Sequence, residues 1–212
     1  MGAPLSLSKP RQAAIGLGHL SQTIEILHGF EWDETKRKTI IRIVAISGVG
    51  MITPWNWPIN QISCKVAPAL AAGCTMVLKP TEIAPLNAIL FAEVMDAAGV
   101  PAGVFNMING DGPTVGEAMS SHPGIDMISF TGSVETGSLI IKEASKNITK
   151  VNLELGGKAP AIVLADADID KAVEYAATAR FANCGQVCTC NARLYVTNKV
   201  SDKLLHRFLS HD

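Results

Sequence analysis

Residues 44–52 read VAISGVGMI and begin a series of short apolar runs that decides the expected fold. Each run is four to nine residues long and rich in Val, Ile and Leu, which is typical of strands buried on both faces of a parallel sheet. The further runs are 75–78, 104–108, 125–130, 151–155, 161–164 and 194–197.

Segments with helical periodicity separate these runs. One helix is predicted after Pro85, with Gly99 and Pro101 ending it. Its apolar stripe comprises Leu86, Ile89, Leu90, Val94 and Ala97. Asp168 is the predicted N-cap of a second helix, which runs through Ala172, Val173, Ala176 and Ala177. The alternation predicts parallel strands with right-handed helical crossovers, and therefore an α/β, doubly wound sheet.

The chain is expected to contain parts of two domains. Residues 1–42 form a helical and linking segment, with a weak helix over Ala13–Gly29 and a polar stretch over Phe30–Lys38. Residues 43–156 form a dinucleotide-binding domain, and residues 157–212 begin a second α/β domain that carries catalytic groups. A helix starts near Lys203, and the sequence stops at Asp212. We therefore expect a truncated chain.

Composition favours a small-molecule partner. The chain has 212 residues, 48% of them apolar, and a formal net charge of -1. Without a basic run it offers no electrostatic footprint for nucleic acid or for an anionic membrane surface. No apolar stretch approaches the roughly 20 residues that span a bilayer.

The five cysteines indicate reduced thiols. The N-terminus lacks a secretory pattern, so a disulfide framework is not expected and the cytoplasm is the predicted compartment. Cys188 and Cys190 flank a single residue, and no second pair or nearby His completes a zinc set. No metal site is predicted.

Cys188 ends the sequence GQVC and is the candidate nucleophile. It lies between a predicted helix and the strand Arg193–Thr197, where a turn can present a side chain to a cleft. A thiolate that adds to an aldehyde carbon forms a hemithioacetal, whose oxyanion can expel hydride to a nicotinamide. The alternative is an inert, buried thiol, with Cys184 and Cys190 as rivals.

Two other polar residues suit the same chemistry. Glu154 lies in the apolar run 151–155, so the sequence predicts a desolvated carboxylate able to act as a general base for water. The alternative is an edge strand whose Glu154 faces solvent. Asn56 stands in the rigid loop PWNWP, where its amide can donate to an oxyanion, unless it is an ordinary turn residue.

Three loops after predicted strands suit a dinucleotide. The stretches Gly110–Gly116 and Gly132–Gly137 place backbone amides where a pyrophosphate binds, although neither is a Gly-x-Gly-x-x-Gly motif. Lys79 and Glu82 can bind ribose hydroxyls, and a carboxylate there repels a 2′-phosphate, which favours NAD over NADP. The alternatives are tight turns and a solvated ion pair.

Five motifs, in order and at similar spacing, together resemble the aldehyde dehydrogenase superfamily. The resemblance covers the whole chain, most securely residues 49–196, and the stretch 158–190 is most similar to bacterial lactaldehyde and glycolaldehyde dehydrogenases. The motifs are PWNWP at 54–58, KPTE at 79–82, FTGS at 130–133, LELGGK at 153–158 and GQVC at 185–188.

The resemblance implies a role for each matching residue. Cys188 is the nucleophile, its backbone amide joins Asn56 in an oxyanion hole, and Glu154 activates the water that releases the acid. The implied cofactor is NAD, with NADP disfavoured, and the substrate is a small aldehyde. The implied cofactor contacts are Trp55, Lys79, Thr81, Glu82, Gly112, Gly116, Gly132, Ser133, Gly137 and Leu155.

The chain also departs from the family pattern. Family members are much longer homo-oligomers, and we expect this chain to lack the start of their cofactor domain, most of their catalytic domain and the strand that pairs subunits. The expected protein is therefore an NAD-dependent aldehyde dehydrogenase fragment with little turnover of its own. The alternatives are an inactive cofactor-binding fragment and an acylating, coenzyme A-dependent relative, against which the Glu154 motif argues.

Overall fold

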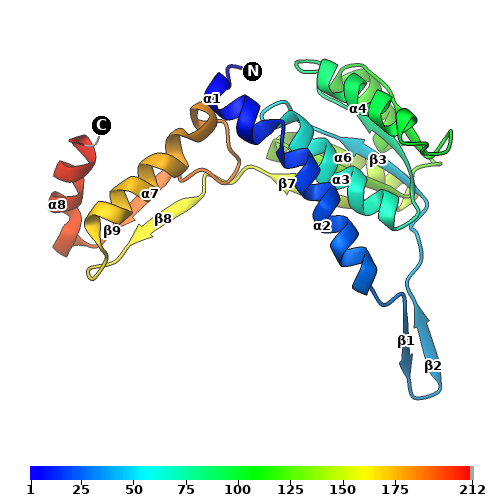
Figure 1. The fold of residues 1–212 in the computed structure, drawn as a ribbon, viewed down its shortest axis with the longest axis horizontal. Coiled ribbons are helices and arrows are strands. Elements are labelled where there is room, and N and C mark those ends of the chain that lie inside the picture. Colours follow the sequence, from blue (N-terminus) through cyan, green and yellow to red (C-terminus); the bar gives the residue numbers. More distant parts are fainter. Residues whose placement is uncertain (211–212) are drawn as a thin grey trace. The chain divides into compact units, whose positions relative to one another are not determined.

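The computed structural model describes residues 1–210, which form two compact units (Figure 1). The first unit runs from Leu5 to Leu155, and the second runs from Gly156 onward and includes Gly2–Pro4. Residues 211 and 212, which end the segment predicted to begin a catalytic domain, lie outside the described residues. Within the described part, no helix is long and apolar enough to cross a membrane.

A five-stranded parallel sheet forms the centre of the first unit, in the order β5-β4-β3-β6-β7. The chain moves outward from β3 to β4 and β5, and then returns to the other side of β3 to form β6 and β7. This reversal between β3 and β6 is a topological switch point, and it confirms the predicted doubly wound α/β class. The strands are β3 (Gly48–Ile52), β4 (Thr75–Lys79), β5 (Phe105–Met107), β6 (Met127–Gly132) and β7 (Lys150–Leu155).

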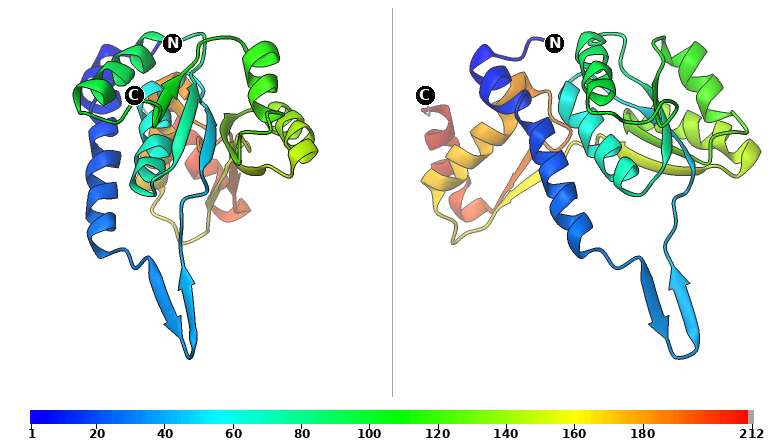
Figure 2. Two further views of the ribbon diagram at one scale, coloured as in Figure 1. Left: turned by 90° about the vertical axis from the view of Figure 1, so that its right-hand side faces the viewer. Right: turned by 45° about the vertical axis from the view of Figure 1, so that its right-hand side comes forward.

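Helices cover both faces of this sheet (Figure 2). Val49 and Met51 pack in one core with α3 and α4, whereas Ile52 packs in another with α5 and α6, because successive strand residues point to opposite faces. The helical elements are α3 (Pro58–Ala71), α4 (Leu86–Ala97), the π-helical turn η2 (Gly112–Gly116), α5 (Glu117–Ser120), α6 (Val134–Ala144) and the 3₁₀ turn η3 (Ser145–Asn147).

The N-terminal part of the first unit packs on α3. A Cβ on Gly16 of α2 would lie 2.8 Å from Cγ1 of Ile59, so a larger side chain would push the two helices apart. A β-hairpin follows, which the sequence did not predict, and Arg42 joins its strands by hydrogen bonds of 2.7 Å to both oxygens of Asp33. The elements are α1 (Leu5–Leu7), the π-helical turn η1 (Ser8–Gln12), α2 (Ile15–Gly29), β1 (Asp33–Lys36) and β2 (Thr39–Arg42).

The second unit is a parallel pair of strands with two helices. Its core contains Val163, Ile169, Val173 and Leu204. The predicted N-cap of α7 is confirmed, because the Asp168 carboxylate accepts a hydrogen bond of 3.2 Å from the Lys171 amide. The elements are β8 (Pro160–Val163), α7 (Ile169–Phe181), the 3₁₀ turn η4 (Ala182–Gly185), β9 (Arg193–Val196) and α8 (Asn198–Leu209).

The predicted burial of most strands and of one face of α4 was wrong. All seven predicted strands exist, but only β3, β4 and β6 are largely buried, because β7 is an edge strand and β8 and β9 have no further neighbours within the described residues. On α4 the predicted stripe is mostly exposed, with Leu86 at 72% and Leu90 at 61%. The face toward the sheet instead carries Ala88, Phe91 and Met95. The helix is apolar on both faces, so its periodicity does not tell which face packs inward.

Candidate cofactor and catalytic site

The loops that carry most predicted site residues leave one edge of the sheet. Ile52 at the end of β3 pairs with Lys79 on β4 and with Phe130 on β6, and Gly132 pairs with Leu155 on β7. Parallel strands end at the same edge, and open α/β sheets bind ligands beyond that edge at the switch point. The register therefore gathers loops that are distant in the sequence.

Lys79 and Glu82 form an ion pair at this edge. Lys79 Nζ donates to Glu82 Oε2 at 3.0 Å, and the Lys79 side chain is buried while that of Glu82 is 57% exposed. A hydrogen bond from its own backbone amide, and then the one from Lys79, hold the pKa of the Glu82 carboxyl below its usual range. Thr81 between them is buried and accepts a hydrogen bond of 3.3 Å from the Ile83 amide. The loop thus presents an ionised carboxylate to solvent.

The loop after β5 turns sharply into η2. Gly110 has a φ of +154°, and a Cβ there would lie 2.3 Å from Cγ2 of Val115. Asp111 caps the turn, because its carboxylate accepts a hydrogen bond of 2.7 Å from the Thr114 amide. That bond is the main cause of the lowered pKa of Asp111, and the charge of Lys79 contributes further. Lys79 therefore acts electrostatically on both loops.

The loop from β6 to α6 is built around two glycines. A Cβ on Gly132 would lie 2.3 Å from the ring of Phe130, and one on Gly137 would lie 2.9 Å from Cδ2 of Leu155. Between them Ser133 caps α6, and its Oγ accepts a hydrogen bond of 3.1 Å from the Thr136 amide. Only glycine allows this close packing, which holds the helix N-terminus against the ends of β6 and β7.

A cavity of about 440 Å³ lies between η2–α5 and α6. Ile52 from the end of β3 also lines it, so the cavity lies beside the switch point. Two of the predicted cofactor residues, Gly112 and Gly116, are in its wall. The residues that line it are Ile52, Gly112, Pro113, Gly116, Glu117, Ser120, Thr136, Leu139, Ile140, Lys142 and Glu143.

Trp55 and Asn56 lie half-buried in the loop between β3 and α3. Gln12 holds this loop, since its Nε2 donates to the backbone carbonyl of Asn56 at 3.3 Å. The helix α3 starts at Pro58, a residue suited to the first helical position. The loop thus places Asn56 directly beyond the end of β3.

The expected burial of Glu154 was wrong. Glu154 is exposed near the end of β7, which is the edge strand of the sheet. The open side of that strand lacks a neighbouring strand among the described residues, so an apolar run does not imply burial there. The solvent-facing alternative describes the residue in this chain.

Sequence reasoning missed Lys65. Its side chain is buried, and Nζ donates to Oγ of Ser129 on β6 at 3.0 Å. Burial lowers the pKa of the Lys65 ammonium, while the charges of Cys64 and Glu154 act in the opposite direction. Burial likewise raises the pKa of the Cys64 thiol. The sequence signal that could have identified Lys65 is its position three residues after the apolar Ile62, on the packed face of α3.

Cys188 lies in the second unit as an exposed, free thiol in the turn between η4 and β9. The preceding turn is strained, because Asn183, Cys184 and Gly185 all have positive φ, at 51°, 58° and 75°. Cys190 is buried and accepts a hydrogen bond of 3.2 Å from Nη1 of Arg180. The shared role of Cys188 with Glu154 and Asn56 stays a prediction.

In the part of the chain that the structure describes, no group of His, Cys, Asp and Glu side chains is arranged to hold a metal ion.

Comparison with known proteins identifies relatives along nearly the whole chain. A family model described as "Aldehyde dehydrogenase family" matches residues 11–211. A 3-succinoylsemialdehyde-pyridine dehydrogenase from a Pseudomonas species is 48% identical over 97% of the chain, and the chain spans 43% of that relative.

Solved structures give the same result. Aldehyde dehydrogenase C from Pseudomonas syringae, crystallised with NAD⁺ and octanal, is 43% identical, with a TM-score of 0.95 over 98% of this chain and 43% of its own. Lactaldehyde dehydrogenase from Escherichia coli is 40% identical, with a TM-score of 0.92 over 98% of this chain and 44% of its own.

Proposed function

The chain belongs to the aldehyde dehydrogenase family, and on that premise we propose that it serves the NAD-dependent oxidation of an aldehyde to a carboxylic acid. One observation carries the proposal: loops after β3, β4, β5 and β6 meet at the switch point of a doubly wound sheet, beside a cavity of about 440 Å³. Because the chain spans 43% of its curated relative, the activity of the whole protein is part of this proposal.

The residues at this edge fit a dinucleotide. The pyrophosphate is placed at the N-terminus of α6, where Gly132 and Gly137 keep the backbone free of side chains and Ser133 fixes the first turn. We place the adenine base of the dinucleotide in the cavity, whose walls include Ile52, Pro113 and Leu139. Apolar walls of this kind suit a flat heteroaromatic ring. The bound dinucleotide supplies the hydride acceptor.

NAD rather than NADP is proposed from the charge on Glu82. The exposed carboxylate is held ionised by its lowered pKa, and Lys79 fixes its position. Carboxylate oxygens accept hydrogen bonds from the ribose hydroxyls of NAD, whereas a 2′-phosphate at the same place would bring two negative charges together.

The proposed chemistry begins at Cys188. Its thiolate adds to the aldehyde carbon, and the resulting oxyanion is stabilised by the Asn56 amide and the Cys188 backbone N–H. Loss of hydride leaves a thioester on Cys188. Glu154 then takes a proton from water, whose oxygen attacks the thioester and releases the acid and the thiol. The exposed position of Glu154 gives that carboxylate access to water, and the buried Lys65 supplies a nearby positive charge.

A second candidate is a cofactor-binding protein with little turnover of its own. It is favoured by the second unit, whose two-stranded sheet leaves Ile162 and Tyr195 exposed. Parallel sheets are normally covered on both faces, so a catalytic turn beside such a sheet is poorly supported. On this second candidate, the 212-residue chain binds NAD and forms little NADH.

One experiment distinguishes these functions. NAD binding is measured by calorimetry and NADH formation by absorbance, with a small aldehyde, in the unchanged chain, Cys188→Ala and the matched control Cys184→Ala. Turnover that requires Cys188 but not Cys184 supports the dehydrogenase. Binding without turnover supports the second candidate. Turnover that persists in Cys188→Ala overturns the assigned nucleophile, and absence of NAD binding overturns the cofactor site.

A further inference from the structure

The two walls of the cavity present side chains with the same spacing. Thr136, Leu139, Ile140 and Glu143 line one wall, at intervals of three, four and seven residues along α6. Seven residues of helix span roughly 10 Å, enough for a ribose and a purine ring. The wall begins beside the N-terminus of α6 and ends at a carboxylate.

The opposite wall repeats the pattern. Pro113, Gly116, Glu117 and Ser120 of η2 and α5 line it at the same intervals of three, four and seven residues. Apolar Leu139, Ile140 and Pro113 and the small Gly116 thus form the middle and one side of the cavity, and Glu143 and Ser120 stand at the end of the two walls. The cavity thus has an apolar slot that leads from the helix N-terminus to a polar far end.

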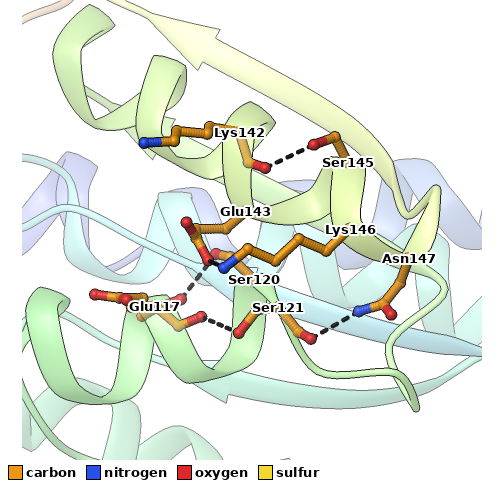
Figure 3. A network of polar contacts seen from close by, with 9 residues as sticks. Glu117, Ser120, Ser121, Lys142, Glu143, Ser145, Lys146 and Asn147 are labelled. Atoms are coloured by element: carbon orange, nitrogen blue, oxygen red, sulfur yellow. Dashed lines mark hydrogen bonds and ion pairs between the residues drawn. The ribbon is translucent and has the colours of Figure 1, made fainter.

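The far end is held by a polar network (Figure 3). Lys146 on η3 forms an ion pair with Oε2 of Glu143 on α6. Both side chains point toward α5, the helix that carries Ser120. Asn147 Nδ2 donates to the Ser121 carbonyl at 2.7 Å, which ties η3 to the end of α5. Ser120 Oγ donates to the Gly116 carbonyl at 2.8 Å. These bonds fix the spacing of the walls and the position of the carboxylate.

We propose that Glu143, positioned by Lys146, selects the base of the bound dinucleotide by accepting a hydrogen bond from the exocyclic amino group of adenine. The inference rests on the proposed function, because it assumes that the cavity takes the base. A base that carries a carbonyl at the same ring position, such as hypoxanthine, would direct an oxygen at the carboxylate and bind less well.

The surroundings of Glu143 favour such selection. Its side chain is only 17% exposed, so water competes weakly for its oxygens. Lys146 already donates to Oε2 of Glu143, and Leu139 and Ile140 beside it in the cavity wall carry no side-chain donor. Two further charged groups line the cavity, Glu117 and Lys142. Glu117 would add to the preference for an amino group, and Lys142 would oppose it.

The test compares two dinucleotides that differ at one ring substituent. Binding of NAD and of nicotinamide hypoxanthine dinucleotide to the purified chain is measured by calorimetry. We expect NAD to bind about tenfold more tightly, because it gains one hydrogen bond to a charged group. A tenfold ratio of dissociation constants corresponds to about 1.4 kcal/mol. In Glu143→Gln the side-chain amide can donate to the carbonyl of hypoxanthine, so the preference should fall to near unity.

A matched variant controls for charge on the same helix. Glu135 is exposed in the first turn of α6 and does not line the cavity, so Glu135→Gln should keep the tenfold preference. Circular dichroism melting checks that each variant is folded. Equal binding of the two dinucleotides to the unchanged chain overturns this inference and leaves the proposed function intact. Binding of neither one overturns the proposed cofactor site, and the inference with it.

Discussion

The two units use similar sequence patterns with different results. In the first unit, strands such as β3 and β6 lie between two neighbours and under helices on both faces, and their apolar side chains are buried. In the second unit, β8 and β9 have no strand partner but each other among residues 1–210, and Ile162 and Tyr195 are exposed. An apolar run therefore specifies a strand, whereas the neighbouring strands and the covering helices decide whether that strand contributes to a core.

The largest expected effect is the difference in stability loss between a leucine substitution in the first unit and one in the second. Leu78→Ala in the first unit removes a side chain with 0% exposure and should lower the free energy of unfolding by about 2–5 kcal/mol. Leu164→Ala in the second unit removes one with 58% exposure, and the change should stay within about 0.5 kcal/mol. Urea unfolding followed by circular dichroism measures both. Equal losses would mean that the second unit has a covered face in solution.

The second largest effect is expected on the preference for NAD over NADP at the sheet edge. Glu82→Gln removes the negative charge beside Lys79 and should improve NADP binding about tenfold, while NAD binding weakens slightly. Calorimetric titration of both dinucleotides gives the ratio. The matched control is Glu93→Gln, an exposed change on α4 that should leave the ratio unchanged. An unaltered ratio in Glu82→Gln would remove the basis for preferring NAD.

The two capped helices offer a closer comparison. Ser133→Ala on α6 and Asp168→Ala on α7 each remove a side chain that accepts an N-terminal amide hydrogen bond. Each should destabilise its own helix by about 1 kcal/mol, seen as faster amide hydrogen exchange in that helix alone. Only Ser133→Ala should also weaken NAD binding, because only α6 meets the proposed pyrophosphate site. Weaker binding in both variants would contradict this assignment.

The smallest effect concerns the buried amine. The pKa of Lys65 is lowered in the folded state, so the unfolded chain holds this proton more tightly. Stability should therefore rise with pH between that lowered pKa and the ordinary lysine value of about 10.4. The raised pKa of the Cys64 thiol makes stability fall with pH from about pH 8.5 upward. The comparison is therefore between Cys64→Ala and the double variant Cys64→Ala/Lys65→Met. Thermal melts across this range should show the rise only while Lys65 is present.

Several features were predictable because they depend on short stretches of chain. The seven strands follow from apolar runs, the start of α4 from Pro85, and the cap of α7 from Asp168. The parallel order follows from the alternation of strand and helix patterns. Motifs at five places were also sufficient to indicate the family, which the comparisons confirm.

Other features required the tertiary structure. The sequence could not tell that β7 lies at the edge, and so that Glu154 is exposed, because strand order depends on which distant segments pair. It gave no sign of the hydrogen bond between Lys65 and Ser129, or of the cavity between α5 and α6. Periodicity and turn residues act over a few neighbouring residues, and they determine the elements. Burial, charge environment and cavities arise where those elements meet, and only the assembled fold decides them.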